Sequence, residues 1–438
     1  MAGTLKGGGK SVRIAELGGA VGERVEIRGW VLSLRKSGGI RFLVVRDGSG
    51  QVQMVLREKE VSPEVWEATG SLGIETSIVA RGRCRADLRA PSGVEVDLDD
   101  VEVVGASHDY PIQPKEHGVD FLLDRRHLWL RSQRQAAILR VRSRFEQAIR
   151  SWLDEHDFIA ADTPILTPSA CEGTTTLFET TYFEQKAYLS QSGQLYNEAL
   201  AQALGKVYCF GPAFRAERSK TRRHLIEFWM VEPEMAFTDL DGCLETVEEM
   251  LSYAIAQLVE RCSDELRLLG RDPEELAQVK APFPRISYDD ALGILREDGL
   301  EIPWGEDFGA PHEAAISQRF KLPVFVHRYP TQAKAFYMKP DPERPDVVLS
   351  ADLLAPEGYG EIVGGGQRID DYGLLLQRLH EQDLPEEDYD WYLDLRRYGS
   401  VPHSGFGLGI ERTLAWILKL EHVRETIPFP RMLYRLRP

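Results

Sequence analysis

The first part of the chain alternates apolar and polar residues with the period of β-strands. Runs such as RVEIRGWVLSL and RFLVVR lie between residues 12 and 105, and Gly-rich turns separate them. The sequence DGSG at 47–50 is typical of a hairpin turn between two strands. Short strands that recur about every ten residues, with turn signals between them, predict a small antiparallel barrel. We therefore expect an OB-type β-barrel over residues 1–105.

The alternation also assigns side chains to the two faces of this barrel. Leu43 and Val45 fall on one face, whereas Phe42 and Arg46 fall on the other. The next strand adds Gln53 to that second face. An aromatic ring beside an amide and a guanidinium is typical of a surface that stacks nucleic-acid bases. An edge-strand phenylalanine under a loop would give the same pattern, and periodicity does not separate the two interpretations.

The rest of the chain mixes helical and strand-like patterns. Residues 106–131 combine Pro, His and charged residues and predict a hinge. A helix should follow, because apolar residues recur at spacings of three and four from Ile138 onward, and this stripe needs a partner in the same domain or in a second subunit. The irregular order of elements predicts an α+β domain over 132–438, on a largely antiparallel sheet flanked by helices. Residues 269–322 show no interpretable motif and are a possible insertion packed on that sheet.

Composition narrows the class of protein. The 438 residues are 43% hydrophobic and 28% charged, as in globular proteins, and this length predicts more than one domain. A run of about 18 apolar residues is absent, so the sequence predicts no membrane-spanning helix. The five cysteines form no CxxC pair, which argues against a structural zinc site. The N-terminus does not resemble a secretory signal, and we expect a cytoplasmic protein.

A net charge of −16 argues against a nucleic-acid partner unless basic residues cluster locally. The densest cluster is FRAERSKTRRHLIEF at 214–228, which has the pattern of a strand, a cationic loop and a returning strand. Arginine pairs phosphate oxygens bidentately, so the tip of this hairpin could close over a polyphosphate. A solvated hairpin whose charges pair with one another is the alternative.

Two further segments carry candidate chemistry. In GFGLGIER at 405–412, a Gly-rich strand leads into a helix with Arg412 in its first turn. The glycines allow a flat ligand to approach the backbone, and a cation at the positive end of a helix suggests that it holds an anion. Asp352 and Glu361 precede the Gly-rich GGGQR and could hold Mg²⁺ through their oxygens.

Taken in order, three segments resemble the signature motifs of class II aminoacyl-tRNA synthetases. FIAADTPILTP (158–168) resembles motif 1, FRAERSKTRRHLIEFWMVEPE (214–234) motif 2, and GFGLGIER motif 3. With the N-terminal barrel, nearly the whole chain is similar to the aspartyl/asparaginyl/lysyl subgroup. The resemblance implies a class II catalytic domain, an anticodon-binding OB fold, and a homodimer whose interface is built by motif 1 around Pro164.

The resemblance implies how ATP is bound. Arg215 would hold the α-phosphate, where negative charge builds as the amino-acid carboxylate attacks. Arg412 would cover one face of the adenine and reach the γ-phosphate, so both arginines are the expected catalytic residues. Glu217 would accept from the adenine amino group, and Phe228 would stack on the other adenine face.

The outer phosphates and the metal have implied partners as well. Arg223 and His224, in the motif 2 loop, would touch the outer phosphates. Asp352 and Glu361 would carry Mg²⁺, which shields the phosphates and stabilises the leaving pyrophosphate. On the barrel, Phe42 and Gln53 match the residues that stack on and hydrogen-bond the central anticodon base in the aspartyl and asparaginyl enzymes. Together with Arg46 they predict an anticodon-binding surface.

The stretch SQSGQLYN at 190–197 bears on the choice of amino acid. Aspartyl enzymes resemble it but carry Lys at the position of Asn197, where it pairs the substrate carboxylate. Without that cation, a buried carboxylate would lack a partner, whereas a neutral amide does not need one. Arg368 is expected to donate to the side-chain oxygen of the substrate. Glu227 is expected to accept from its amide NH₂ and to repel an aspartate.

The resemblance completes the amino-acid site with Ser192 and Gln194, which would hold the backbone end, and with Glu172, which would meet the α-ammonium. It predicts ligation of L-asparagine to tRNA(Asn) through an adenylate, with release of AMP and pyrophosphate. An aspartyl enzyme that binds its carboxylate through Arg368 alone is the first alternative. A tRNA-independent asparagine synthetase and an OB-fold nucleic-acid binder with a degenerate synthetase domain are the others.

Overall fold

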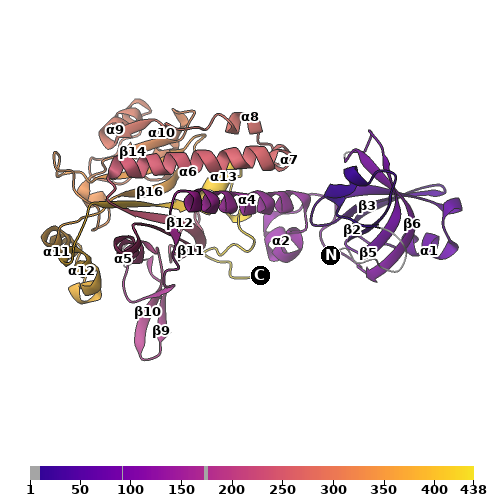
Figure 1. Ribbon diagram of the computed structural model, residues 1–438, viewed down its shortest axis with the longest axis horizontal. Helices are drawn as coiled ribbons and strands as arrows, with labels where there is room; N and C mark the ends of the chain where they lie inside the picture. The colour runs from indigo at the N-terminus through magenta and orange to yellow at the C-terminus, as the bar shows by residue number, and fades with distance from the viewer. Residues whose placement is uncertain (1–9, 91, 172–175) are drawn as a thin grey trace. The chain divides into compact units, whose positions relative to one another are not determined.

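The structure is a computed structural model that describes residues 10–90, 92–171 and 176–438, and it divides into two compact units, Met1–Gly118 and Val119–Pro438 (Figure 1). The division falls inside 106–131, the predicted hinge. The second unit begins before the expected residue 132, because it includes helices α2 (Val119–Asp124) and α3 (Arg126–Trp129). The buried guanidinium of Arg126 fastens α3 by donating to the carbonyl oxygens of Pro428 at 2.8 Å and Ile427 at 2.9 Å.

The first unit is a closed β-barrel, as the alternation predicts. Its strands lie in the order β1-β2-β3-β4-β6-β5, and β2 also pairs with β5, which closes the sheet. The strands are β1 (Lys10–Ser11), β2 (Arg24–Ser37), β3 (Ile40–Arg46), β4 (Gln51–Arg57), β5 (Ser77–Ala86) and β6 (Val94–Gly105). Leu43, Val45 and Met54 point into the core and are buried. Helix α1 (Pro63–Gly70) is capped by Ser62, whose hydroxyl accepts from the Val65 amide.

The second unit is built on one large, mainly antiparallel sheet with the order β13-β14-β15-β16-β17-β12-β11-β7. Within the described part of this sheet, only the outermost pairs, β13–β14 and β11–β7, are parallel. The strands are β7 (Ile159–Ala160), β11 (Lys206–Phe214), β12 (Glu227–Ala236), β13 (Arg285–Ser287), β14 (Val324–His327), β15 (Ser350–Ala355), β16 (Gly360–Gln367) and β17 (His403–Gly409). This α+β arrangement confirms the predicted fold class.

Two long helices, α4 (Gln133–Glu155) and α6 (Leu240–Arg261), lie side by side along the sheet (Figure 1). The predicted apolar stripe of α4, with Ile138 and Phe145, is fully buried in a core shared with α6 and the sheet. The stripe therefore finds its partner within the chain. Further helices are α5 (Gln194–Leu204), α7 (Ser263–Leu268), α8 (Pro273–Leu276), α9 (Tyr288–Glu297), α10 (Ala310–Gln318), α11 (Tyr372–Glu381), α12 (Asp390–Arg397) and α13 (Ile410–Ile417).

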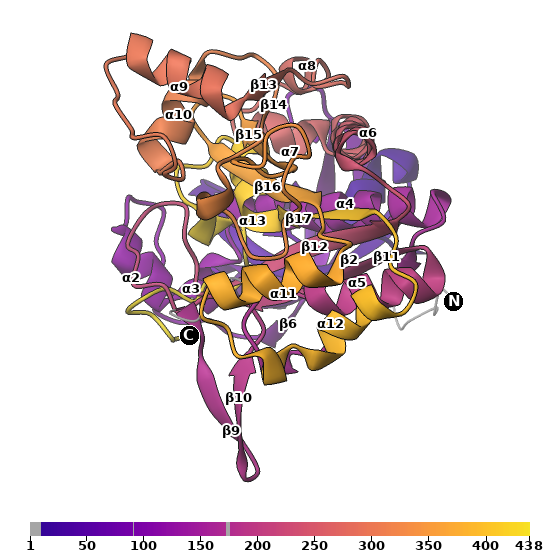
Figure 2. The same ribbon diagram turned by 90° about the vertical axis from the view of Figure 1, so that its left-hand side faces the viewer.

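The segment 269–322 extends the catalytic sheet. It supplies the edge strand β13 and the helices α9 and α10, which bury Tyr288, Leu292 and Ile316 against β14. A small sheet of order β8-β10-β9 stands apart, and its hairpin projects from the unit in both views (Figure 2). Its strands are β8 (Leu166–Thr167), β9 (Glu179–Tyr182) and β10 (Gln185–Leu189). In the described part of the chain, no helix has the length and apolar character that a membrane crossing requires.

Candidate active site

A cavity of about 550 Å³ opens on one face of the large sheet, and a smaller hollow of about 70 Å³ adjoins it. Arg215, Met230, Glu361 and Gly407 line both, so the two spaces meet at these residues. The floor is flat because β16 and β17 contribute glycines there. A Cβ at Gly407 would stand 2.4 Å from the Met230 side chain, so a larger residue would displace this wall.

Strand β12 sets the polarity of the cavity through its alternation. Phe228, Met230, Glu232 and Glu234 lie on the face that lines the two hollows. Glu227 is not among the described lining residues, because it lies on the other side of the strand opposite Phe214 and bridges to the C-terminal segment at Arg431. Glu227 therefore lies away from the face where the substrate amide was expected, and its contact with that amide stays a prediction.

Glu234 holds Arg368 at one end of the cavity. The two side chains form a bidentate ion pair, with Nε–Oε1 at 3.1 Å and Nη2–Oε2 at 3.0 Å, and both are buried. Among the residues that the structure describes, the third guanidinium nitrogen, Nη1, has only the weak acceptor Met338 Sδ at 3.6 Å. Burial alone would lower the pKa of Arg368, but Glu234 raises it, so the guanidinium stays charged. Arg368 thus presents a fixed donor to the cavity.

Glu232 anchors the start of α5 beside this pair. Its carboxylate accepts from the Ser192 hydroxyl and from the Gly193 amide, the latter at 3.0 Å. The Ser192 oxygen in turn accepts from the amide of Gln194, the first residue of α5, at 3.1 Å. Asn197, one turn later, donates its side-chain amide to the Glu232 carbonyl at 2.8 Å. The predicted residues Ser192, Gln194 and Asn197 all line the cavity.

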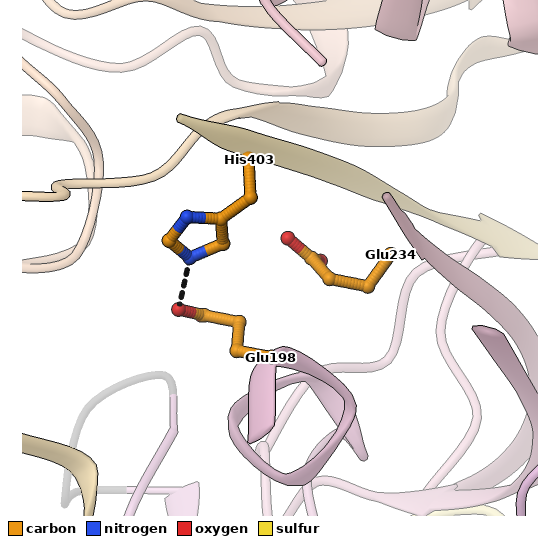
Figure 3. A group of neighbouring side chains, drawn as sticks. All are labelled: Glu198, Glu234 and His403. Carbon is orange, nitrogen blue, oxygen red and sulfur yellow. Dashed lines mark hydrogen bonds and ion pairs between the residues drawn. The ribbon is translucent and has the colours of Figure 1, made fainter. Parts of the chain in front are cut away.

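Three buried groups lie together beside the cavity, namely Glu198 of α5, Glu234 of β12 and His403 of β17 (Figure 3). They have the side chains of a metal site, but their charges are already matched. Glu198 accepts from Arg396 at 2.6 Å and from His403 at 2.9 Å, while Glu234 pairs with Arg368. A metal ion here would have to compete with two guanidiniums, so the cluster is an ion-pair network.

The smaller hollow gathers the cationic residues of motifs 2 and 3. Arg412 donates to Glu361 at 2.8 Å, and Arg223 pairs with Glu313 of helix α10. Glu217 and His224 face each other, with His224 Nε2 3.4 Å from the carboxylate. Burial and the nearby Arg412 lower the pKa of His224, so its ring is neutral at neutral pH. Arginines, a stacking ring and a carboxylate acceptor can together hold an anionic nucleotide.

Phe228 supplies the aromatic wall of this hollow. The guanidinium carbon of Arg215 lies 5.5 Å from the centre of its ring. Strand β11 ends at Phe214, so Arg215 begins a loop instead of continuing the strand. Arg215 and Glu217 nevertheless line the hollow together, as the spacing of two predicts.

Two carboxylates meet where the spaces join. A Cβ built on Gly364 would stand 3.0 Å from Glu361 Oε1 and 3.4 Å from Asp352 Oδ1, so these oxygens flank the same glycine. Their other oxygens bind Arg412 at 2.8 Å and Lys334 at 2.7 Å. Burial and the neighbouring Glu361 raise the pKa of Asp352 to about 7, against the lowering effect of Lys334. Each carboxylate thus keeps one oxygen beside Gly364, and two such oxygens are a donor set that fits a divalent cation.

On the barrel, the strand register brings the three predicted residues to one face. Val44 is opposite Gln53 and Arg46 is opposite Gln51, so Phe42, Arg46 and Gln53 share a side. The Arg35 guanidinium lies 4.4 Å from the centre of the Phe42 ring. Arg46 pairs with Glu75 at 2.5 Å, and Gln53 donates to Glu95 at 2.5 Å.

The family description "tRNA synthetases class II (D, K and N)" matches residues 118–433, which include both hollows. The chain belongs to the class II tRNA synthetases. A second family description, "OB-fold nucleic acid binding domain", matches residues 25–104 of this synthetase. The predicted OB fold and class II catalytic domain are thus both confirmed.

Three relatives of this synthetase illustrate the similarity. The chain is 58% identical over 429 residues to the asparagine–tRNA ligase of Pelotomaculum thermopropionicum, with 98% of this chain and 100% of that one covered. The asparagine–tRNA ligase of Thermus thermophilus is 55% identical over 436 residues, with 98% and 100% covered. The solved asparaginyl-tRNA synthetase of Pyrococcus horikoshii, complexed with asparaginyl-adenylate, has a TM-score of 0.95 at 46% identity, covering 98% of this chain and 99% of that one.

The synthetase site also contains residues that sequence reasoning missed. Glu234, Lys334 and Glu313 line the larger cavity, and Glu313, from the segment 269–322, pairs with Arg223 of the smaller hollow. Period-two alternation in EFWMVEPEM would have found Glu234, since it separates Glu227 from the cavity face. No local pattern marks Lys334 or Glu313. The predicted Glu172 lies outside the described residues, and Pro164 is exposed on the segment before β8.

Proposed function

We propose that this synthetase ligates L-asparagine to tRNA(Asn) in two steps. In the first, the asparagine carboxylate attacks the α-phosphate of ATP, which forms asparaginyl-adenylate and releases pyrophosphate. In the second, a terminal ribose hydroxyl of the tRNA attacks the adenylate carbonyl and AMP leaves. The observation that carries the choice of amino acid is the cavity floor, where Asn197 and Arg368 both line the cavity and the guanidinium charge of Arg368 is already balanced by Glu234. The names of the relatives described above support it.

The residues of the smaller hollow suit binding and activation of ATP. Arg215 lies at the junction with the amino-acid cavity, where the α-phosphate has to meet the carboxylate. Its guanidinium would stabilise the charge that develops there without needing a side-chain nucleophile. Arg412 and Phe228 would enclose the adenine, with Glu217 as acceptor for its amino group. Arg223 and His224 would contact the outer phosphates.

Asp352 and Glu361 would hold Mg²⁺ beside the triphosphate. The ion would shield phosphate charge and stabilise the departing pyrophosphate. The amino acid would lie over the floor made by Ser192 and Gln194, with its side chain directed to Arg368.

The proposal extends to partners and compartment. The barrel face with Phe42, Arg46 and Gln53 would bind the anticodon of tRNA(Asn) in the cytoplasm. A homodimer through motif 1 is supported by exposed apolar side chains around Pro164, where Ile165 is 46% and Leu166 is 42% exposed. A molar mass of twice 49.5 kDa in light scattering would agree with this dimer.

ATP–pyrophosphate exchange with asparagine and aspartate in parallel tests the function. Exchange should depend on asparagine, and tRNA(Asn) should then be charged with it. Exchange stimulated by aspartate alone would identify an aspartyl enzyme. Free asparagine made from aspartate and ammonia would identify a tRNA-independent synthetase.

A further inference from the structure

The side-chain amide of Asn197 has a defined orientation. Its Nδ2 donates to the Glu232 carbonyl at 2.8 Å and to Cys209 Sγ at 3.3 Å. The reverse orientation would place Oδ1 against the Glu232 carbonyl, where two acceptors would face each other. The backbone of β12 therefore determines which end of the amide faces Glu232.

The oxygen at the other end of this amide receives no hydrogen bond from the described residues. Asn197 is completely buried, and its Oδ1 has no hydrogen-bond partner among the residues that the structure describes. A buried acceptor without a partner costs folding free energy, so native proteins keep one mainly where a ligand or water completes it. Asn197 is also among the residues that line the 550 Å³ cavity.

The Arg368 guanidinium and the Asn197 side-chain amide are both held by strand β12, at positions that are two residues apart. Asn197 binds the backbone of Glu232, and Arg368 binds the side chain of Glu234. Residues two apart in a strand point to the same face and are separated by about 6.5 Å. A carboxamide has one acceptor and one donor end, so it can use both groups at once. A carboxylate has only acceptors and would face Oδ1 with another oxygen.

We propose that Asn197 Oδ1 accepts a hydrogen bond from the side-chain NH₂ of the substrate while Arg368 donates to its carbonyl oxygen. This assignment rests on the proposed function, because it requires asparagine as the substrate. It gives Asn197 an active part in rejecting aspartate, and it takes over the role that the sequence predicted for Glu227.

The test is a cycle that changes both the enzyme and the substrate. The analogue 2-amino-4-oxopentanoate keeps the carbonyl of asparagine and replaces its NH₂ with a methyl group. In ATP–pyrophosphate exchange, the wild type should use this ketone at least about 100-fold less well than asparagine in kcat/KM, because Oδ1 loses its donor. Asn197→Leu should lower kcat/KM for asparagine toward that of the ketone and leave the KM for ATP unchanged.

Cys209→Ala is the matched control. Its thiol contacts the same amide through Nδ2, and Cys209 is not among the described residues that line the cavity. This variant should keep the wild-type preference for asparagine over the ketone and over aspartate. If Asn197→Leu does not fold, Asn197→Ser, whose hydroxyl is too short to replace Oδ1, takes its place in the cycle.

The outcomes separate this inference from the proposed function. An Asn197 variant that loses activity on asparagine and ketone by the same factor would overturn the contact and leave only a structural role. A wild type that uses the ketone as well as asparagine would also overturn it. A wild type stimulated by aspartate and not by asparagine would instead overturn the proposed function.

Discussion

Buried carboxylates near the cavity are balanced by arginines from distant parts of the chain. Glu198 on α5 meets Arg396 on α12 at 2.6 Å, and Glu234 on β12 meets Arg368 after β16 at 3.0 Å. Such pairs contribute little net stability, because desolvation of the two charges offsets their attraction. These pairs instead fix the positions of the two chain segments that they join. Removing one partner leaves an uncompensated charge in the interior, so these residues are expected to tolerate no change of charge.

Glu198→Gln tests this expectation. The substitution keeps the shape of the side chain but removes the charge that faces Arg396 and one of the acceptors of Tyr392, which donates to Glu198 at 2.7 Å. The free energy of unfolding should fall by about 3–5 kcal/mol, measured by urea denaturation. Glu249→Gln, on the exposed side of α6, should change it by less than about 0.5 kcal/mol. Equal, small effects of both variants would contradict the proposed importance of the buried pair.

At the scale of elements, regular patterns predicted most of the fold, and the misses have physical causes. Period-two alternation predicted the barrel, and the apolar stripe predicted α4. The segment 269–322 escaped because β13 and α10 are defined by contacts with β14 and β16 rather than by a pattern of their own. The motif assigned Glu227 to the substrate by order along the chain, whereas its face on β12 decides what it touches. Pairs such as Glu198–Arg396 join remote positions and leave no local signal.

Strands β12 and β17 approach each other so closely that a single added methyl group should disturb their packing. Gly405 is paired with Glu234, and a Cβ at Gly405 would stand 2.0 Å from Glu234 Oε2 and 2.4 Å from the Pro233 carbonyl oxygen. Gly405→Ala should therefore displace the carboxylate that holds Arg368. We expect a loss of about 1–3 kcal/mol in unfolding free energy and at least a tenfold drop in kcat/KM for asparagine in exchange.

Gly211→Ala is the matched control for this substitution. Gly211 lies in β11, next to β12 on its other side, and a Cβ there would have no atom within 4 Å outside its chain neighbours. Its exchange kinetics should stay close to those of the wild type. Normal exchange by Gly405→Ala would show that the position of Glu234 is not limiting for amino-acid activation.

At the scale of the whole molecule, the sites proposed for amino-acid activation and for anticodon binding belong to different units. Both hollows are lined by residues of Val119–Pro438, whereas the surface with Phe42 belongs to Met1–Gly118. In the proposed function, the adenylate would form on the second unit, and the barrel would contribute only to holding the tRNA.

Phe42→Ala separates these two steps. The ring is partly exposed on the barrel, with the Arg35 guanidinium 4.4 Å from its centre, and a base stacked on such a ring contributes about 1–3 kcal/mol. The variant should lower kcat/KM for tRNA(Asn) charging by roughly 5- to 150-fold, through KM for tRNA, and leave exchange unchanged. Val21→Ala truncates another exposed apolar side chain of the same unit and should affect neither assay. If Phe42→Ala also reduced exchange, the barrel would be coupled to activation; if charging stayed normal, the anticodon would bind elsewhere on the barrel.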